Sequence, residues 1–245
     1  MYHYSIILLA VAAVFACGNT DDTSSPQPVN PNTPPAFDII AASARYDAEL
    51  DHLVFTIDVA GEAGAETPVP AGQLDGAPVF GYVFPTTLTS TEVGFSATEG
   101  IVALALTSHP DFDDTPLRDE DNNRNYADDG RVWHPHWVVL VEDDRVAGGL
   151  AVKQFAAGDS TVVLPPTNPG MPMYMDSPGF SVSERDGKIH CVVPAYRLNG
   201  RRDFNFDGVT ARMEVNTSDP DRPMLGVYEV WDVASGNLSL PYTVD

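Results

Sequence analysis

A succession of short strand-like segments, separated by Gly, Pro and Asp, restricts most strongly what this 245-residue chain can fold into. In residues 53–59, apolar side chains alternate with polar ones, as in a strand with one buried face. We find no segment longer than about 10 residues with the apolar spacing of an amphipathic helix. The pattern predicts an all-β fold, a single β-sandwich or barrel-like domain with long acidic and Pro/Gly-rich loops.

The expected strands are spaced along the whole of this domain. The segments at 39–46 and 53–59 should form one hairpin, and those at 180–183 and 188–196 a second. The remaining candidates are 79–84, 100–107, 132–142, 145–155, 162–164, 209–215, 224–233 and 238–244.

The N-terminal residues have the character of a leader. Residues 6–15 are apolar but too few to span a bilayer, which fits a signal peptide. Val14-Phe15-Ala16-Cys17 resembles the bacterial lipoprotein box, although Phe15 replaces the usual small residue and no Lys or Arg precedes the apolar run. The resemblance implies that residues 1–17 are a lipoprotein signal peptide with a lipidated Cys17. Ordinary secretion with cleavage near the same point is the alternative.

Residues 18–36 are rich in Pro, Ser, Thr and Asn and predict a disordered tether, which leaves residues 37–245 as the β domain. A lipidated Cys17 would leave Cys191 as a lone thiol, so no intrachain disulfide is expected. Its apolar neighbours suggest a small buried side chain. We therefore expect a bacterial membrane-anchored lipoprotein, periplasmic or at the cell surface.

The net charge of −22 limits the possible partners. Such a surface repels nucleic acid and anionic membranes and attracts cations. Adaptation to a salty medium would explain the same composition. We therefore expect metal ions as partners, and a membrane reached only through the N-terminal lipid, whereas the charge does not identify protein partners.

Residues 130–142 carry two of the six histidines and two of the three tryptophans. In a strand over 132–142, His134, His136 and Glu142 share one face, and Trp133 and Trp137 share the other.

Two imidazoles at i and i+2 can chelate a divalent ion of the zinc or copper type, with a third donor from elsewhere. We expect that donor to be His190, with Glu142 and His109 as alternatives. The competing interpretation is that His134 and His136 are ordinary strand residues.

The loop 111–129 is a candidate calcium site. It offers oxygen ligands at alternate positions and a carboxylate a few residues on, as a calcium loop does. Those candidates are Asp119, Asp121, Asn123 and Asn125, followed by Asp128 or Asp129. Against calcium, Arg124 stands at the expected Gly, and Gly130 at the expected Glu. A solvated turn-rich loop is the alternative.

Residues 203–214 match the EF-hand pattern D-x-N-x-D-G-x5-E at each specified position. The alternation that follows Gly208 favours a strand over a helix, so we expect a hairpin turn at Asp207-Gly208.

Two resemblances concern the histidine segment. The spacing from Gly130 through His134, His136 and Glu142 to Gly148 loosely resembles the first cupin metal motif, which would imply a metalloenzyme. The intervals differ from the cupin pattern, however, and no Asn follows His190 at the second motif. Residues 108–142 are also similar to stretches of uncharacterised secreted bacterial proteins with a His-x-His-Trp strand, a resemblance that implies no known activity.

Motifs of nucleophilic hydrolases, phosphate-binding loops and HExxH zinc proteases are absent from the sequence. The leading hypothesis is a non-enzymatic, lipid-anchored protein outside the cytoplasm that holds, senses or transfers a divalent cation. A calcium-stabilised adhesion or carbohydrate-binding module is the first alternative, and a cupin-like metalloenzyme the second.

Overall fold

The computed structural model describes residues 32–245 except Pro116 and Ala127. The expected leader and Cys17 lie outside the described residues. The end of the expected tether does not: Thr33 donates its hydroxyl to the carbonyl of Trp231, and Ala36 is buried. The chain therefore packs against the domain a few residues before the predicted boundary at residue 37.

The described residues form thirteen strands and four short 3-10 turns, which confirms the all-β prediction. The strands are β1 (Ile39–Asp47), β2 (His52–Val59), β3 (Ala77–Pro85), β4 (Ile101–Ser108), β5 (His134–Glu142), β6 (Leu150–Val152), β7 (Met175–Asp176), β8 (Ser181–Arg185), β9 (Lys188–Pro194), β10 (Asn205–Phe206), β11 (Val209–Val215), β12 (Leu225–Val233) and β13 (Tyr242–Thr243). The turns are η1 (Pro35–Phe37), η2 (Ser90–Val93), η3 (Asp129–Arg131) and η4 (Ala195–Leu198).

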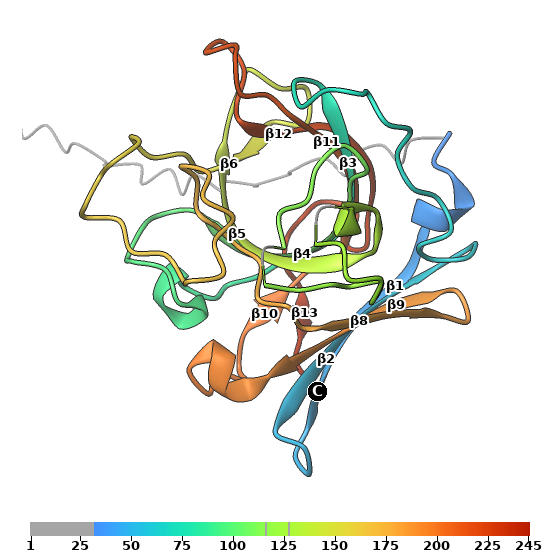
Figure 1. The fold of residues 1–245 in the computed structure, drawn as a ribbon. Helices are drawn as coiled ribbons and strands as arrows, with labels where there is room; N and C mark the ends of the chain where they lie inside the picture. Colours follow the sequence, from blue (N-terminus) through green and yellow to red (C-terminus); the bar gives the residue numbers. More distant parts are fainter. Residues whose placement is uncertain (1–31, 116, 127) are drawn as a thin grey trace, which may run out of the picture.

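Six of the strands close into an antiparallel barrel. They follow one another in the order β4-β3-β11-β12-β6-β5, and β5 pairs back onto β4. Figure 1 looks into the resulting ring. The short strand β7 pairs with Trp137 and Val138 of β5, on the edge opposite β4. Closure leaves β3, β4, β11 and β12 paired on both sides, which removes the free edges that an open sheet would expose.

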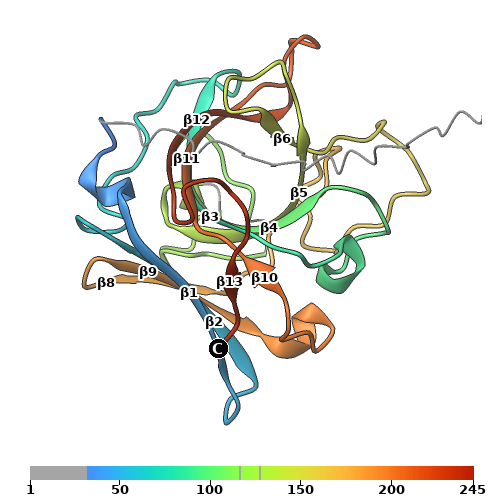
Figure 2. The ribbon, with the colours of Figure 1, turned by 180° about the vertical axis from the view of Figure 1, so that it is seen from behind.

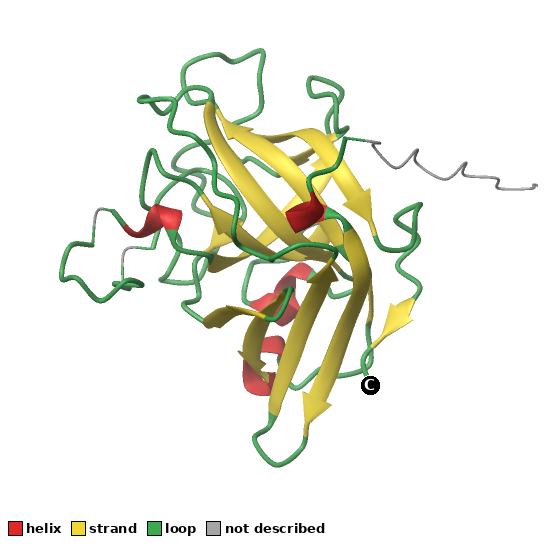
Figure 3. Cartoon of the chain, turned by 90° about the vertical axis from the view of Figure 1, so that its right-hand side faces the viewer, coloured by secondary structure: helices red, strands yellow, loops and turns green. Residues whose placement is uncertain are grey.

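A second sheet packs on the outside of the barrel. Its strand order is β1-β2-β9-β8, and it crosses beside the ring in both Figure 1 and Figure 2. It contains both predicted hairpins, β1–β2 and β8–β9. The small β10–β13 pair lies on the same side, and Figure 3 shows how strands dominate the architecture.

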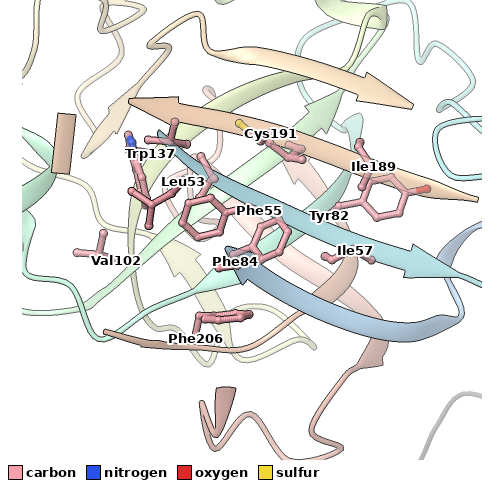
Figure 4. Packing of buried hydrophobic residues seen from close by; sticks show 14 of the residues in the cluster. Leu53, Phe55, Ile57, Tyr82, Phe84, Val102, Trp137, Ile189, Cys191 and Phe206 are labelled. Carbon is pink, nitrogen blue, oxygen red and sulfur yellow. The ribbon is translucent and has the colours of Figure 1, made fainter. Parts of the chain in front are cut away.

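Strand alternation divides the buried side chains into two clusters. On β3, β4 and β5, one set of alternate residues faces the second sheet, for example Tyr82, Leu104 and Trp137. The other set faces the barrel interior, for example Val83 and Ala105. Figure 4 shows the first cluster, the main core, between the barrel wall and the sheet of β2 and β9.

Cys191 belongs to this main core and is a free, fully buried thiol. Burial raises the pKa of the thiol, so it stays protonated and poorly reactive at neutral pH. This matches the interpretation of Cys191 as a small buried side chain.

Some sequence expectations need correction. The segment 209–215 is a strand as predicted, but Asp207-Gly208 does not close a hairpin, because β10 pairs with β13 and β11 with β3 and β12. Asp207 is buried and accepts hydrogen bonds from Ser235, so its carboxylate has partners within the protein and needs no bound ion. The segment 162–164 forms no strand, and 238–244 contributes only β13.

Within the described residues, no helix has the length and apolar character needed to cross a membrane.

The main core supplies a test of the fold. Ile57 on β2 is fully buried, whereas Ile40 on β1 is 65% exposed. We expect Ile57→Ala to lower the free energy of unfolding by about 2–5 kcal/mol, because it removes buried methyl groups and leaves a cavity. The matched change Ile40→Ala should cost about 0.5 kcal/mol or less. Urea denaturation measures both, and similar losses for the two variants would contradict the packing described.

Candidate metal centre

One end of the barrel interior is polar and holds three histidines. β5 begins with His134 and His136, which alternate onto its inner face. The register of β4 and β5 places Thr107 opposite His134. His109 follows β4 by one residue and continues the parity of Thr107, so its ring reaches the same end.

Asp114, from the loop after β4, completes the group. Its Oδ1 lies 3.2 Å from Nε2 of His109 and 3.1 Å from Nε2 of His134. Its Oδ2 lies 3.5 Å from Nε2 of His136. The two nitrogens of His109 and His134 are 3.0 Å apart. All four side chains are buried, and their donor atoms lie within 4.8 Å of one another.

Each imidazole is oriented by a hydrogen bond from its other nitrogen. Nδ1 of His134 lies 2.6 Å from the carbonyl oxygen of Val132, and Nδ1 of His109 lies 2.9 Å from that of Phe112. A carbonyl oxygen only accepts, so both Nδ1 atoms carry the proton and donate it.

The imidazole of His136 is also oriented by a hydrogen bond from its Nδ1, in this case to a hydroxyl oxygen. Ser177 donates its hydroxyl to the carbonyl of Asp114 at 2.6 Å, and its oxygen therefore accepts from Nδ1 of His136 at 3.1 Å. Histidines that bind metals characteristically donate the remote N–H in this way, which fixes the tautomer and the orientation of the ring.

The consequence is that three Nε2 atoms and a carboxylate point at one place. Nε2 of His136 is buried and makes no hydrogen bond. Two neutral Nε2 lone pairs 3.0 Å apart, on His109 and His134, would repel each other unless a proton or a cation lies between them. A buried, unsatisfied polar atom in a group of metal-ligand types calls for an occupant.

The charges of the group are strongly coupled. Burial opposes ionisation of Asp114, but the facing imidazoles of His136 and His109 outweigh it and hold the pKa of Asp114 well below its usual range. Burial likewise lowers the pKa of His134, but the hydrogen bond to Asp114 outweighs that effect and the net pKa is raised. Burial lowers the pKa of His136 to about 3, so this ring is neutral at physiological pH.

The separations fit a tetrahedral ion. Four ligands placed about 2.0–2.1 Å from a central zinc lie roughly 3.3–3.4 Å from one another, the edge of that tetrahedron. The separations among Nε2 of His109, Nε2 of His134 and Oδ1 of Asp114, from 3.0 to 3.2 Å, are close to this edge. Nε2 of His136 lies 3.5 Å from the second oxygen of Asp114. All the donor atoms lie within 4.8 Å of one another, so one ion could be shared by the four side chains.

Backbone packing holds the loop against His109. The amide of His109 donates to the carbonyl of Gly130 at 2.6 Å. A Cβ atom on Gly130 would lie 2.0 Å from the carbonyl oxygen of Phe112 and 2.7 Å from Nδ1 of His109, so only glycine fits. The ring of Phe112 stacks on that of His109 with centroids 4.0 Å apart.

The structure brings together only part of the predicted histidine site. His134 and His136 share a face as expected, and the third donor is His109, one of the two expected alternatives to His190. Asp114 is a fourth donor that the sequence pattern does not single out. His190 lies on β9 in the outer sheet, where its Nδ1 bonds to the hydroxyl of Thr56. Glu142 is exposed at the far end of β5, so the cupin-like ligand set is not assembled.

The acidic loop forms a separate group in which Asp119, Asp121 and Asp129 offer oxygens within 4.8 Å of one another. Many polar groups of the loop form hydrogen bonds within the loop. Asp119, for example, accepts from the backbone amides of Asn123 and Arg124. Asn123 donates its side-chain amide to Asp121 and, at 3.4 Å, to Asp128.

The side-chain oxygen Oδ1 of Asn123 is also engaged, since it accepts from the backbone amide of Asn125. Of the two carboxylates expected to close the loop, Asp128 and Asp129, the fully buried Asp129 is the one that joins the group.

No protein-family model, curated protein or solved structure matches this chain. The assignment of function therefore depends on the geometry of the site.

Proposed function

We propose that this protein binds one divalent transition-metal ion, of the zinc type, through His109, Asp114, His134 and His136. The observation that carries the proposal is the convergence of three buried Nε2 atoms, each with its Nδ1 already donating, on one buried carboxylate. Copper(II) is the alternative ion, because it binds nitrogen ligands more tightly than zinc does, but it prefers a tetragonal arrangement.

The composition of the site favours holding an ion over catalysis with it. Structural zinc sites have four protein ligands, whereas catalytic sites keep one position open for water or substrate. Here four protein donors are present, and the burial of all of them limits the access of water. We therefore propose a non-enzymatic role in which the ion is stored, sensed or used to stabilise the barrel.

The proposed place of this activity is the outer side of a bacterial membrane, with Cys17 lipidated. Support comes from the sequence of residues 1–17, which resembles a lipoprotein leader. The acidic net charge of −22 adds a general attraction for cations around the domain.

The first experiment measures zinc binding by calorimetry and elemental analysis of the purified protein. We expect one zinc ion per chain, and a loss of affinity of at least about 100-fold in His134→Gln, because one of four ligands is removed. The matched change His190→Gln, at the histidine on the outer sheet, should leave zinc affinity unchanged.

Asp114→Asn serves as a second variant, because it keeps the shape of the side chain while removing its charge. It should lower zinc affinity without unfolding the domain. Absence of zinc and copper binding below millimolar concentration, or equal losses in the His134 and His190 variants, would end the proposal.

Zinc affinity should also depend on pH in a defined direction. Below the raised pKa of His134 that ring is protonated, so zinc must displace a proton and its affinity should fall by about tenfold per pH unit. Above that pKa the affinity should level off. His136 stays neutral throughout, since its pKa is about 3. Calorimetry at several pH values checks this, and an affinity that rises on acidification would contradict the assignment of His134 as a ligand.

The second candidate is a calcium-stabilised module, in which calcium holds the acidic loop and the domain serves adhesion or carbohydrate binding. One observation favours the ion: Oδ2 of Asp129 is buried without a hydrogen-bond partner, within the group that includes Asp119 and Asp121. Burial, and then the neighbouring Asp121 and Asp113, raise the pKa of Asp129, as expected for a carboxylate placed among others without a cation.

Calcium binding by this loop would raise the melting temperature. At a calcium concentration of 100 times Kd, the native state should gain about 2.7 kcal/mol. We expect the calcium-dependent increase in Tm to be lost in Asp129→Asn and retained in His134→Gln. A calcium response that is absent from the unaltered protein, or identical in Asp129→Asn, would leave the loop as a self-bonded turn structure.

A further inference from the structure

The barrel interior contains a cavity in addition to the polar group. The cavity has a volume of about 570 Å³ and lies inside the ring of strands seen in Figure 1. Protein interiors normally leave few voids larger than a water molecule. Cavities that bind small molecules span roughly 300–1,000 Å³. The volume is therefore that of a ligand site and not of a packing defect.

Small side chains on the inner face of the barrel leave this space. Ala105 on β4 and Ala211 on β11 both line the cavity and are nearly fully buried. In a small barrel the inward residues usually fill the interior, so alanine at these positions keeps it open. The larger lining residues, such as Val138 and Leu140, belong to the barrel wall on β5.

Most side chains of the lining are apolar, and no Asp, Glu, Lys or Arg is among the described residues that form it. The residues with polar side chains are Thr107, His136, Tyr228 and Asn237. The first two are buried at the inner end, and the other two are partly exposed. An apolar cavity of this kind holds water poorly and gains free energy by taking up an apolar molecule.

The two ends of the cavity differ in access. Ala147 and Gly149, in the turn between β5 and β6, line it and are exposed, so this end meets solvent. At the other end His136, Thr107 and Met175 are buried and form a floor. His136 thus belongs both to this floor and to the candidate metal centre behind it.

We propose that the barrel lumen is a binding site for an uncharged, predominantly apolar small molecule, which enters between the β5–β6 turn and the start of the β12–β13 connection. The inference goes beyond metal binding and does not require it, because the lumen is formed by the barrel wall itself. A charged ligand is disfavoured, since the lining offers no ion-pair partner to offset the cost of desolvation.

The test is a fluorescence titration of the purified protein with N-phenyl-1-naphthylamine, a neutral apolar probe. We expect saturable binding of one probe per chain. Ala211→Phe, which fills the lumen, should weaken binding by about tenfold or more, because the probe and the new ring compete for the same volume. Ala41→Phe is the matched control: Ala41 is exposed on β1, outside the barrel, and this variant should bind as the unaltered protein does.

Ala105→Leu provides a second, smaller filling of the same space and should weaken binding if Ala211→Phe does not fold. The anionic analogue 1-anilinonaphthalene-8-sulfonate should bind more weakly than the neutral probe. The proposal would be overturned if the full chain showed no saturable binding of the neutral probe, or if it preferred the anionic probe. It would also be overturned if both filling variants bound the probe as well as the Ala41→Phe control does, or if the control lost as much affinity as the filling variants.

The outcome is independent of the metal experiments. Probe binding that persists in protein without bound zinc leaves the lumen proposal standing even where the metal proposal fails. Zinc binding together with no probe binding removes the lumen proposal alone. A lumen filled by the chain's own N-terminal residues or by a second copy would appear as a full chain that does not take up the probe.

Discussion

The pairing of β4 with β5 is the interaction on which both the barrel and the candidate site depend. It closes the sheet, because β5 would otherwise be joined to the rest only through β6. Its register also sets Thr107 opposite His134 and Ala105 opposite His136, so that His109 and the two strand histidines meet at one end of the barrel. A slip of one residue would turn both histidines out of the interior and into the core beside the outer sheet.

Strand parity made half of this site predictable from the sequence. The alternation over 132–142 places His134 and His136 on one face whichever strands lie beside it. The remaining donors depend on pairing partners, which alternation does not specify. The sequence pattern therefore favours His190, whereas the structure places the alternative, His109, in the group. The available signal was proximity along the chain: His109 directly follows the strand that pairs with β5, and Asp114 lies five residues later.

The acidic loop shows a different limit to what the sequence can predict. Its repeated carboxylates and amides suggest oxygen ligands, yet the same groups satisfy turn backbone amides, as Asp119 does for Asn123 and Arg124. Sequence spacing cannot separate these two uses, because both place an oxygen at alternate positions. The residue that distinguishes them is Asp129, whose carboxylate is buried and only half satisfied. Asp129 is the first residue of the turn η3, which leads into β5, and its burial depends on tertiary packing that no local sequence pattern specifies.

The barrel interior has a polar end and an apolar end because the inward-facing residues of β4 and β5 change in character along the strands. Inward positions on β4 and β5 carry Thr107, His134 and His136 near one end and Ala105 and Val138 beyond them. An ion bound by His109, Asp114, His134 and His136 would cross-link the end of β4, the loop after it and the start of β5, and would hold this end of the barrel closed. The apolar end needs no such link and stays open to solvent through the β5–β6 turn. A closed floor with an open mouth is the arrangement in which a barrel can retain a small molecule, so a metal at one end and a ligand in the lumen would be compatible within one sheet.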